Sequence, residues 1–284
     1  MATLPTPPSP ALVQDDVARA LAEDLGPGDA TAALLPDDPA RAYVIAKESG
    51  VIAGRPWFDA CFLALDPQAR LDWRVQEGQA VDAGTVLVTL QGRTRALVSA
   101  ERPALNFLQT LSATATRTAA YVAAVAGSRT RILDTRKTLP GLRQAQKYAV
   151  RAGGGSNHRM GLYDAVMLKE NHIHAAGSIA AAAAAARAMH PALPLIIEVE
   201  DLDELAQALA TGCERILVDD FSAADLQAAV AMAGGRIPLE VSGGVDLQRL
   251  PAIAATGVDF VSVGALTKHV QALDLSLRLG SPPG

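Results

Sequence analysis

Six short apolar runs in the second half of the chain each end directly at a polar residue or a glycine. The residues that follow the runs are Asp134, Lys169, Glu198, Asp219, Ser242 and Gly264. Helical stretches separate most of the runs, and strands that alternate with helices form βα units with a parallel sheet. In α/β barrels the functional groups lie where strands end and βα loops begin. We therefore expect these positions to converge on one mouth of a barrel.

Positive charge is concentrated around the first two of these strand ends. The window Arg129–His172 contains nine Lys or Arg and three acids, a net charge of +6, whereas the whole chain carries −5. The nine are Arg129, Arg131, Arg136, Lys137, Arg143, Lys147, Arg151, Arg159 and Lys169. Such clusters are often solvated surface, but several of these cations lie at predicted strand ends and beside the turn Gly153–Gly155. Positive charge at a barrel mouth predicts an anionic ligand.

Carboxylates follow on the later strands. They are Glu198, Glu200, Asp219 and Asp220. Beside a phosphate-binding site they suggest Mg²⁺, which proteins hold through one or two carboxylates and substrate phosphates; they also suit ribose hydroxyls. The segments Ser242–Gly244 and Val263–Gly264 then bring backbone close to the mouth, where the last two βα loops of barrels often bind phosphate. A plain tight turn would explain each glycine segment equally well.

The first part of the chain has a different pattern. A helix is predicted over Asp15–Leu25, because Val17, Leu21 and Leu25 share one face. Short apolar runs punctuated by glycines then fit an antiparallel sheet, with strands at residues 41–47, 71–75 and 86–90. Helical spacing returns over residues 98–125.

The remaining composition excludes several classes of protein. The chain has 284 residues and no Lys- or Arg-rich tail, so we expect no nucleic-acid partner. No run approaches the roughly 18 apolar residues of a membrane helix, and residues 1–10 lack the basic and apolar regions of a signal peptide. Cys61 and Cys213 have no paired spacing, as expected for free thiols in the reducing cytoplasm.

Nine segments, in order, resemble those of quinolinate phosphoribosyltransferases. They are Glu101–Phe107, Asp134–Arg143, Lys147–Val150, Gly153–Arg159, Leu168–His172, Glu198–Glu200, Leu217–Phe221, Glu240–Gly244 and Ser262–His269. No single segment is decisive, but their common order is highly specific. The similarity extends from about Val13 to Leu277, which is nearly the whole chain.

The resemblance implies a fold and an assembly. The fold is α/β, with an N-terminal α/β sandwich domain over residues 1–128, which the C-terminal tail 270–284 joins. An incomplete, open α/β barrel follows over residues 129–269. The resemblance also implies a homodimer whose active sites are completed by the N-terminal domain of the neighbouring subunit, a role in de novo NAD biosynthesis, and dependence on Mg²⁺.

The substrates implied by the resemblance are quinolinate and phosphoribosyl pyrophosphate. Guanidinium groups bind planar carboxylates through two hydrogen bonds, which suits the two carboxylates of quinolinate. The quinolinate site comprises Thr135, Arg136, Lys137, His158, Arg159 and Lys169, with Arg102 from the neighbouring subunit. The phosphoribosyl pyrophosphate site comprises Lys137, Glu198, Asp219, Ser242, Gly243, Gly244, Ser262, Val263 and Gly264. His158 and His172 fit a structural hydrogen bond as well as a ligand contact.

Lys137, Glu198 and Asp219 are the catalytic residues that the resemblance implies. The ring nitrogen of quinolinate would attack the anomeric carbon while Mg²⁺-bound pyrophosphate leaves, and the two carboxylates would stabilise the cationic sugar. The new pyridinium then accepts the electrons of the departing carboxylate. A proton must follow, either from Lys137 or from a water.

Three other functions use related residues. A doubly wound phosphoribosyltransferase would carry a Thr-Thr-Gly loop after its paired acids, but Phe221 and Ser222 follow Asp220 here. A molybdenum-transport-associated paralogue would lose the region around Lys169, which is intact. Nicotinate phosphoribosyltransferase takes a single carboxylate, and the number of strand-end cations favours a dicarboxylate instead.

Overall fold

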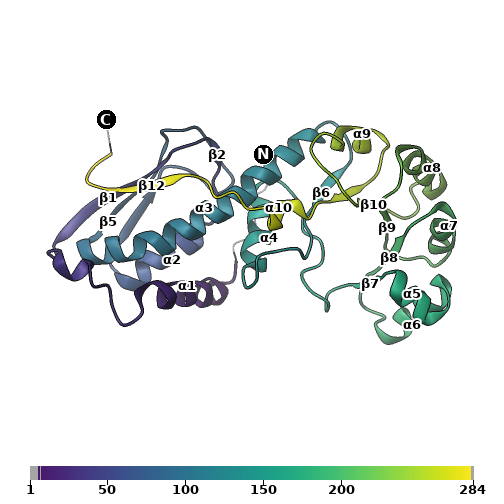
Figure 1. Ribbon diagram of the computed structural model, residues 1–284, viewed down its shortest axis with the longest axis horizontal. Coiled ribbons are helices and arrows are strands. Elements are labelled where there is room, and N and C mark those ends of the chain that lie inside the picture. The colour runs from purple at the N-terminus through teal and green to yellow at the C-terminus, as the bar shows by residue number, and fades with distance from the viewer. Residues whose placement is uncertain (1–5, 7, 283–284) are drawn as a thin grey trace. The chain divides into compact units, whose positions relative to one another are not determined.

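The computed structural model describes residue 6 and residues 8–282, and this part of the chain divides into two compact units (Figure 1). The first unit holds the described residues up to Ala119, the segment Thr138–Gly154 and the described residues from Leu266 on. The second unit holds Ala120–Lys137 and Gly155–Ala265. Residues 1–5 and 7 belong to the segment that we expect to lack signal-peptide features, and they lie outside the described residues.

Four antiparallel strands form the main sheet of the first unit, in the order β12-β1-β5-β3. Their bounds are Leu275–Leu279, Pro39–Ala46, Val86–Arg93 and Arg70–Trp73. A smaller antiparallel pair is formed by β2 (Gly50–Val51) and β4 (Ala80–Val81). Strands β1, β3 and β5 lie where the apolar runs predicted them, and β12 comes from the C-terminal tail.

The long helices of the first unit share its hydrophobic core with the sheet (Figure 1). They are α1 (Pro10–Leu25), α2 (Arg55–Leu65), α3 (Thr94–Ala124) and α4 (Arg143–Ala152), and the short η1 (Ala32–Leu34) and α10 (Ala265–Lys268) complete the set. Helix α1 begins at Pro10 rather than at the predicted Asp15, because proline is well tolerated in the first turn of a helix.

Six parallel strands form the sheet of the second unit, in the order β6-β11-β10-β9-β8-β7. Their bounds are β6 (Arg131–Leu133), β11 (Phe260–Ser262), β10 (Leu239–Ser242), β9 (Arg215–Asp219), β8 (Leu195–Val199) and β7 (Val166–Leu168). Strands β6 and β7 stand at the two edges, and the described residues show no pairing between them. The predicted open α/β barrel is therefore confirmed.

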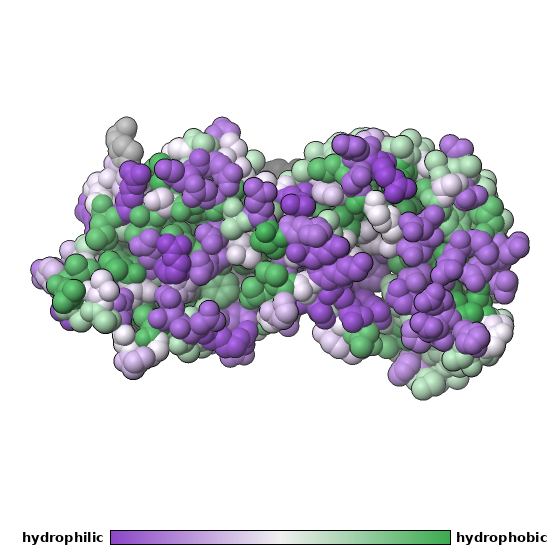
Figure 2. Space-filling view, viewed as in Figure 1, coloured by the Kyte–Doolittle hydropathy of each residue, from purple (hydrophilic) through white to green (hydrophobic). Residues whose placement is uncertain are grey.

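Five helices of the described second unit cover the outside of this sheet (Figure 1). They are α5 (Glu170–Ala176), α6 (Ile179–Met189), α7 (Leu202–Ala210), α8 (Ala223–Ala233) and α9 (Leu250–Ala255). Ser178, Asp201 and Ser222 begin α6, α7 and α8 by accepting a backbone N–H in the first turn. Hydrophilic residues gather around α7 on the face shown in Figure 2. Among the described helices, none has the length and apolarity to cross a membrane.

Glu77 is a buried carboxyl group of the first unit. It accepts the backbone N–H of Gly54 at 2.5 Å and that of Arg55 at 3.3 Å, which holds the start of α2. Gly54 has a φ of +106°, which only glycine adopts without strain. Burial raises the pKa of Glu77 to about 7, although these hydrogen bonds oppose the rise.

We predict that this unit loses stability as the pH rises through neutrality. Because the pKa of Glu77 is higher in the folded state than its ordinary value of 4.5, its favourable contribution is complete below pH 4.5 and is lost as the pH passes about 7. Glu77→Gln should remove part of that loss, on the order of 1–2 kcal/mol. Thermal unfolding between about pH 5 and pH 8 measures it. Asp72→Asn, which alters an exposed carboxyl group, is the control; equal pH slopes in all three proteins would contradict the assignment.

Candidate active site

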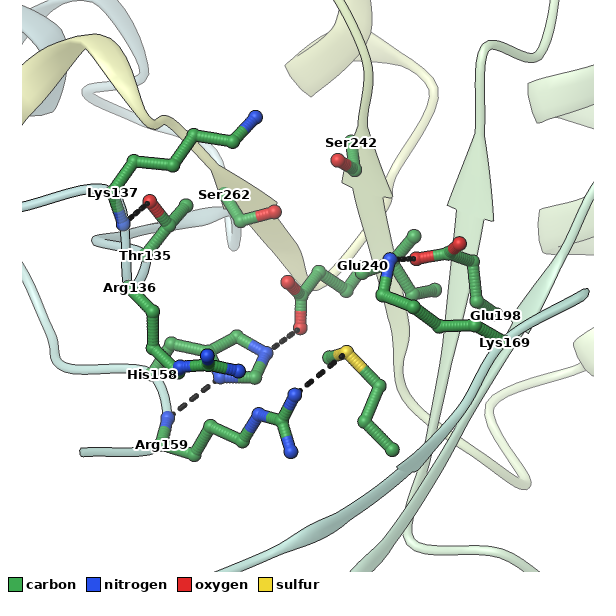
Figure 3. A pocket seen from close by; sticks show the side chains of 12 residues that line it. Thr135, Arg136, Lys137, His158, Arg159, Lys169, Glu198, Glu240, Ser242 and Ser262 are labelled. Carbon is green, nitrogen blue, oxygen red and sulfur yellow. Dashed lines mark hydrogen bonds and ion pairs between the residues drawn. The ribbon is translucent and has the colours of Figure 1, made fainter. Parts of the chain in front are cut away.

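A cavity of about 330 Å³ opens at the carboxyl ends of the parallel strands of the second unit (Figure 3). Its lining residues are Thr135, Arg136, Lys137, His158, Arg159, Met167, Lys169, Glu198, Leu217, Glu240, Ser242 and Ser262. Nine of these were predicted as site residues; Met167, Leu217 and Glu240 were not. Strands far apart in sequence thus bring their ends to one cavity, as parallel barrel strands do.

Six of the predicted site residues do not line this cavity. They are Arg102, Asp219, Gly243, Gly244, Val263 and Gly264. Arg102 is exposed on α3 of the first unit. Asp219 is half-buried at the end of β9, paired in register with Ser242.

Two of these glycines allow close approaches at the strand ends. Gly243 has a φ of +90°, and an added Cβ would lie 2.5 Å from Oδ1 of Asp220. Asp220 itself has a φ of +56°, unusual for a residue other than glycine. At Gly264 an added Cβ would lie 2.9 Å from Cδ of Lys137. Backbone strain and crowding of this kind are concentrated at functional sites.

The loop that carries His158 and Arg159 is fixed by Asp134. This carboxylate is fully buried; it accepts the backbone N–H of His158 at 2.9 Å and the side-chain N–H of Asn157 at 2.6 Å. Ser156 forms a parallel bridge with Leu133 of β6, at the open edge of the barrel. Asp134 does not reach the mouth, contrary to the expectation from the sequence. Its carboxylate instead holds the loop from inside the unit.

Both ring nitrogens of His158 face polar groups of the protein. Nδ1 accepts the backbone N–H of Arg159 at 2.6 Å, and Nε2 lies 3.3 Å from Oε2 of Glu240. The same oxygen accepts a hydrogen bond from Arg215 at 2.9 Å. Burial alone would raise the pKa of Glu240, but the hydrogen-bonding and electrostatic effects of His158, and then those of Arg215, outweigh it and hold the pKa below its usual range.

Four of the nine clustered cations reach the cavity, and the others do not. Arg136, Lys137, Arg159 and Lys169 line it, whereas Lys147 is fully buried in α4 of the first unit. Burial and the nearby charge of Arg136 lower the pKa of Arg159. Two guanidinium groups that destabilise each other's charge form a site in which an anion would be stabilised.

The guanidinium of Arg159 is oriented by its own loop and by β7. Its Nη1 donates to the carbonyl of Ala165 at 3.1 Å, and its Nη2 lies 3.7 Å from the sulfur of Met167 (Figure 3). Asp164 accepts the backbone N–H groups of Met160 and Gly161, which closes the turn between Arg159 and β7. The cation is therefore held before any ligand arrives.

Lys169 connects the cationic and acidic sides of the cavity. Its Nζ lies 2.5 Å from Oε2 of Glu198, which belongs to the neighbouring strand β8 (Figure 3). Its backbone N–H donates to Nδ1 of His172 at 3.1 Å, within a capping box at the start of α5. His172 thus makes the structural hydrogen bond that the sequence left open.

Models of both domains of the quinolinate phosphoribosyl transferase family match the chain. The N-terminal domain model covers residues 29–112 and the C-terminal domain model covers residues 114–278. The chain belongs to the quinolinate phosphoribosyltransferase family.

Individual relatives agree with this assignment. A probable nicotinate-nucleotide pyrophosphorylase (carboxylating) of Synechocystis is 47% identical over 265 residues, which cover 91% of this chain and 90% of the relative. A nicotinate-nucleotide pyrophosphorylase (carboxylating) of Mycobacterium leprae is 44% identical over 94% of this chain and 96% of its own. The solved structure of the nicotinate-nucleotide pyrophosphorylase of Francisella tularensis has a TM-score of 0.92 at 42% identity, covering 98% of this chain and 99% of that one.

Glu240 is the polar lining residue that reasoning from the sequence missed. It lies within the apolar run Leu239–Val241 and was read as part of a strand motif. A signal was present, because a glutamate in the middle of a buried strand is almost never left without a partner. Met167 and Leu217 gave no such signal, since apolar residues in strands normally belong to the core.

The acids beyond Glu198 crowd one another. The nearby carboxylate of Glu170 is the main cause of a raised pKa at Glu200, and Glu204 and Asp219 add to it. Among the described residues, no group of three or more His, Cys, Asp or Glu is placed to hold a metal ion.

Proposed function

We propose that this protein transfers the phosphoribosyl group of phosphoribosyl pyrophosphate to quinolinate, with release of pyrophosphate and carbon dioxide, to form nicotinate mononucleotide for NAD biosynthesis. The observation that supports this most is the cavity in which Arg136, Lys137, Arg159 and Lys169 outnumber the two carboxylates, Glu198 and Glu240. Membership of the family supports it independently.

The two carboxylates of quinolinate would lie among Arg136, Arg159 and Lys169. The fixed guanidinium of Arg159 offers a planar fork to one carboxylate, and Lys169 can leave Glu198 for the other. Thr135 and the ring of His158 complete the wall of this subsite. Because the nitrogens of His158 are engaged, its contact with the substrate would be through the ring rather than through a hydrogen bond.

Phosphoribosyl pyrophosphate would lie towards β8–β11. Glu198 and Asp219 would accept the ribose hydroxyls, and backbone N–H groups at Ser242, Gly243, Gly244, Ser262, Val263 and Gly264 would bind the 5′-phosphate. Lys137 is adjacent to both subsites, since Gly264 approaches its side chain closely. It would therefore contact the pyrophosphate as well as the pyridine acid.

The carboxylates of Glu198 and Asp219 would hold Mg²⁺ only together with the substrate. Glu198 and Asp219 end neighbouring strands, and the mutual repulsion that raises the pKa of Glu200 would be relieved by a cation. Two carboxylates do not suffice alone, which matches the usual reliance of Mg²⁺ on waters and phosphate oxygens. When bound, Mg²⁺ would neutralise the departing pyrophosphate.

Two bonds form and two break in the reaction. The ring nitrogen of quinolinate forms a bond to the anomeric carbon as the bond to pyrophosphate oxygen breaks, while Glu198 and Asp219 stabilise the cationic sugar. The bond to the 2-carboxylate then breaks, and its electrons remain on the carbon beside the pyridinium nitrogen. That carbon takes up a proton, for which Lys137 and a water are the candidates.

We also propose a cytoplasmic homodimer with shared active sites. The exposed Arg102 on α3 is available to a neighbouring subunit. Cys61 and Cys213 are both free and buried, which suits a reducing compartment.

The proposed reaction is tested with the full-length protein, Mg²⁺ and phosphoribosyl pyrophosphate. Quinolinate should yield nicotinate mononucleotide and one carbon dioxide per turnover. Nicotinate should not react, because its single carboxylate would leave part of the positive charge of the site unpaired. Product chromatography and carbon dioxide release measure both. Comparable turnover of the two acids would contradict a dicarboxylate site.

Removal of either acid should reduce catalysis rather than quinolinate binding. We expect Asp219→Asn or Glu198→Gln to lower kcat by roughly 10²–10³-fold, the scale of losing one preorganised electrostatic group. Quinolinate binding without the second substrate should stay nearly unchanged in calorimetry. Loss of quinolinate affinity with kcat preserved would mean that the two subsites are reversed.

Mixing two inactive variants tests the shared site. Arg102→Ala and Lys169→Ala should each be nearly inactive, because each lacks one cation of every site. After subunit exchange, half of the dimers are heterodimers with one intact site, so about a quarter of wild-type activity should return. No recovery despite demonstrated exchange would place Arg102 in its own subunit's site or in a purely structural role.

A further inference from the structure

Glu240 is a fully buried carboxylate in the wall of an anion-binding cavity, and no step of the proposed reaction uses it. Its Oε1 has no hydrogen-bond partner among the described residues. A buried charge lowers the stability of a fold unless it is well compensated, and a negative wall disfavours an anionic ligand. A group with both disadvantages requires a functional explanation.

The neighbours of the two ring nitrogens define where the proton of His158 lies. Since Nδ1 of His158 accepts the backbone N–H of Arg159 at 2.6 Å, Nδ1 carries a lone pair and the ring proton is on Nε2. Nε2 lies 3.3 Å from Oε2 of Glu240, so this carboxylate is placed to accept the Nε2 proton (Figure 3). The ring is therefore the neutral Nε2–H tautomer.

A second proton on His158 would disturb the anion site. This proton would have to bind Nδ1. Nδ1 would then be a donor instead of an acceptor, and it would repel the backbone N–H of Arg159. The backbone of Arg159, and with it the guanidinium in the cavity, would shift. The negative charge of Glu240 by itself would attract such a proton.

Arg215 compensates that charge from the other side. Its Nη1 donates to Oε2 of Glu240 at 2.9 Å, and its guanidinium lies 4.4 Å over the ring of Phe260. Arg215 does not line the cavity. Among the described residues, Arg215 is connected to the cavity through Glu240 and His158.

We propose that Arg215 and Glu240 are positioning residues, which together hold His158 in its neutral Nε2–H tautomer and so keep Arg159 aligned for the carboxylates of the substrate. This inference rests on the quinolinate site proposed above. Glu240 supplies the acceptor for the Nε2 proton. Arg215 supplies a positive charge that offsets the carboxylate, so the carboxylate does not favour a second proton on His158.

Other charged groups face His158 and remain constant in the test. Asp134 accepts its backbone N–H, and Arg136, Arg159, Lys169 and Glu198 line the same cavity. A comparison between wild type and a variant at Arg215 therefore measures the effect of leaving the negative charge of Glu240 uncompensated.

The decisive variant is Arg215→Gln, assayed between about pH 6 and pH 8.5, where histidine titrates. The KM for quinolinate should rise by roughly tenfold towards low pH, the scale of one charge-assisted hydrogen bond, and return to the wild-type value at high pH. The kcat and the KM for phosphoribosyl pyrophosphate should change by less than about twofold. The wild type should lack this step, and so should the control Arg187→Gln, which breaks the exposed pair with Glu214 of the same unit.

A second variant separates charge compensation from loss of structure. In Arg215→Gln combined with Glu240→Gln, the new amide still accepts the Nε2 proton and no charge remains to be balanced, so the pH step should disappear. A raised KM at every pH in both variants would overturn the proposal.

The tautomer can be measured without substrate and without any variant. In the ¹⁵N spectrum of histidine-labelled wild-type protein, His158 should be neutral with its proton on Nε2. A doubly protonated ring, or a proton on Nδ1, would overturn the proposal. Failure of the wild type to use quinolinate would instead reject the proposed function and leave this spectrum as an independent result.

Discussion

Like charges repel, and four cationic side chains share one cavity of about 330 Å³. The cost is visible at Arg159, whose pKa is lowered by burial and by Arg136. Such a cluster persists only if the surrounding fold holds its members in place, here through Ala165 and Met167 at Arg159 and through Glu198 at Lys169. This repulsion would favour a dicarboxylate, because an anion with two negative groups relieves more of it than an anion with one.

The open barrel explains how the cluster is assembled. In a closed barrel the functional residues follow paired strands, whereas here His158 and Arg159 lie on a loop that meets the edge strand β6 only through the bridge between Ser156 and Leu133. A loop needs anchors of its own, which the protein supplies as buried carboxylates. Asp134 holds the backbone of the loop and Glu240 holds the ring of His158. The interior of the second unit therefore holds two buried carboxylates beside an apolar cluster of Ala165, Ile196 and Leu217.

Much of this arrangement could be predicted from the sequence, because strand ends are marked by a change from apolar to polar residues. That pattern identifies Lys169, Glu198 and Ser242 and predicts that they meet at one barrel mouth, and all three line the cavity. It could not identify the partners of side chains. Asp134 follows a strand as the others do, yet it is turned inward, and Glu240 is hidden within an apolar run. Lys147 belongs to a cationic window but packs in the first unit, since adjacency in sequence does not determine which core a helix joins.

The most direct test of the account is a crystal structure of the protein with quinolinate bound. One carboxylate of the ligand should lie within hydrogen-bond distance of the Arg159 guanidinium, and the other should lie between Arg136 and Lys169. The ring nitrogen should then face Glu198 and Asp219, with the His158 ring still bonded to Glu240. Quinolinate bound outside this cavity, or with one carboxylate in open solvent, would contradict the claim that the repelling cations form a dicarboxylate site.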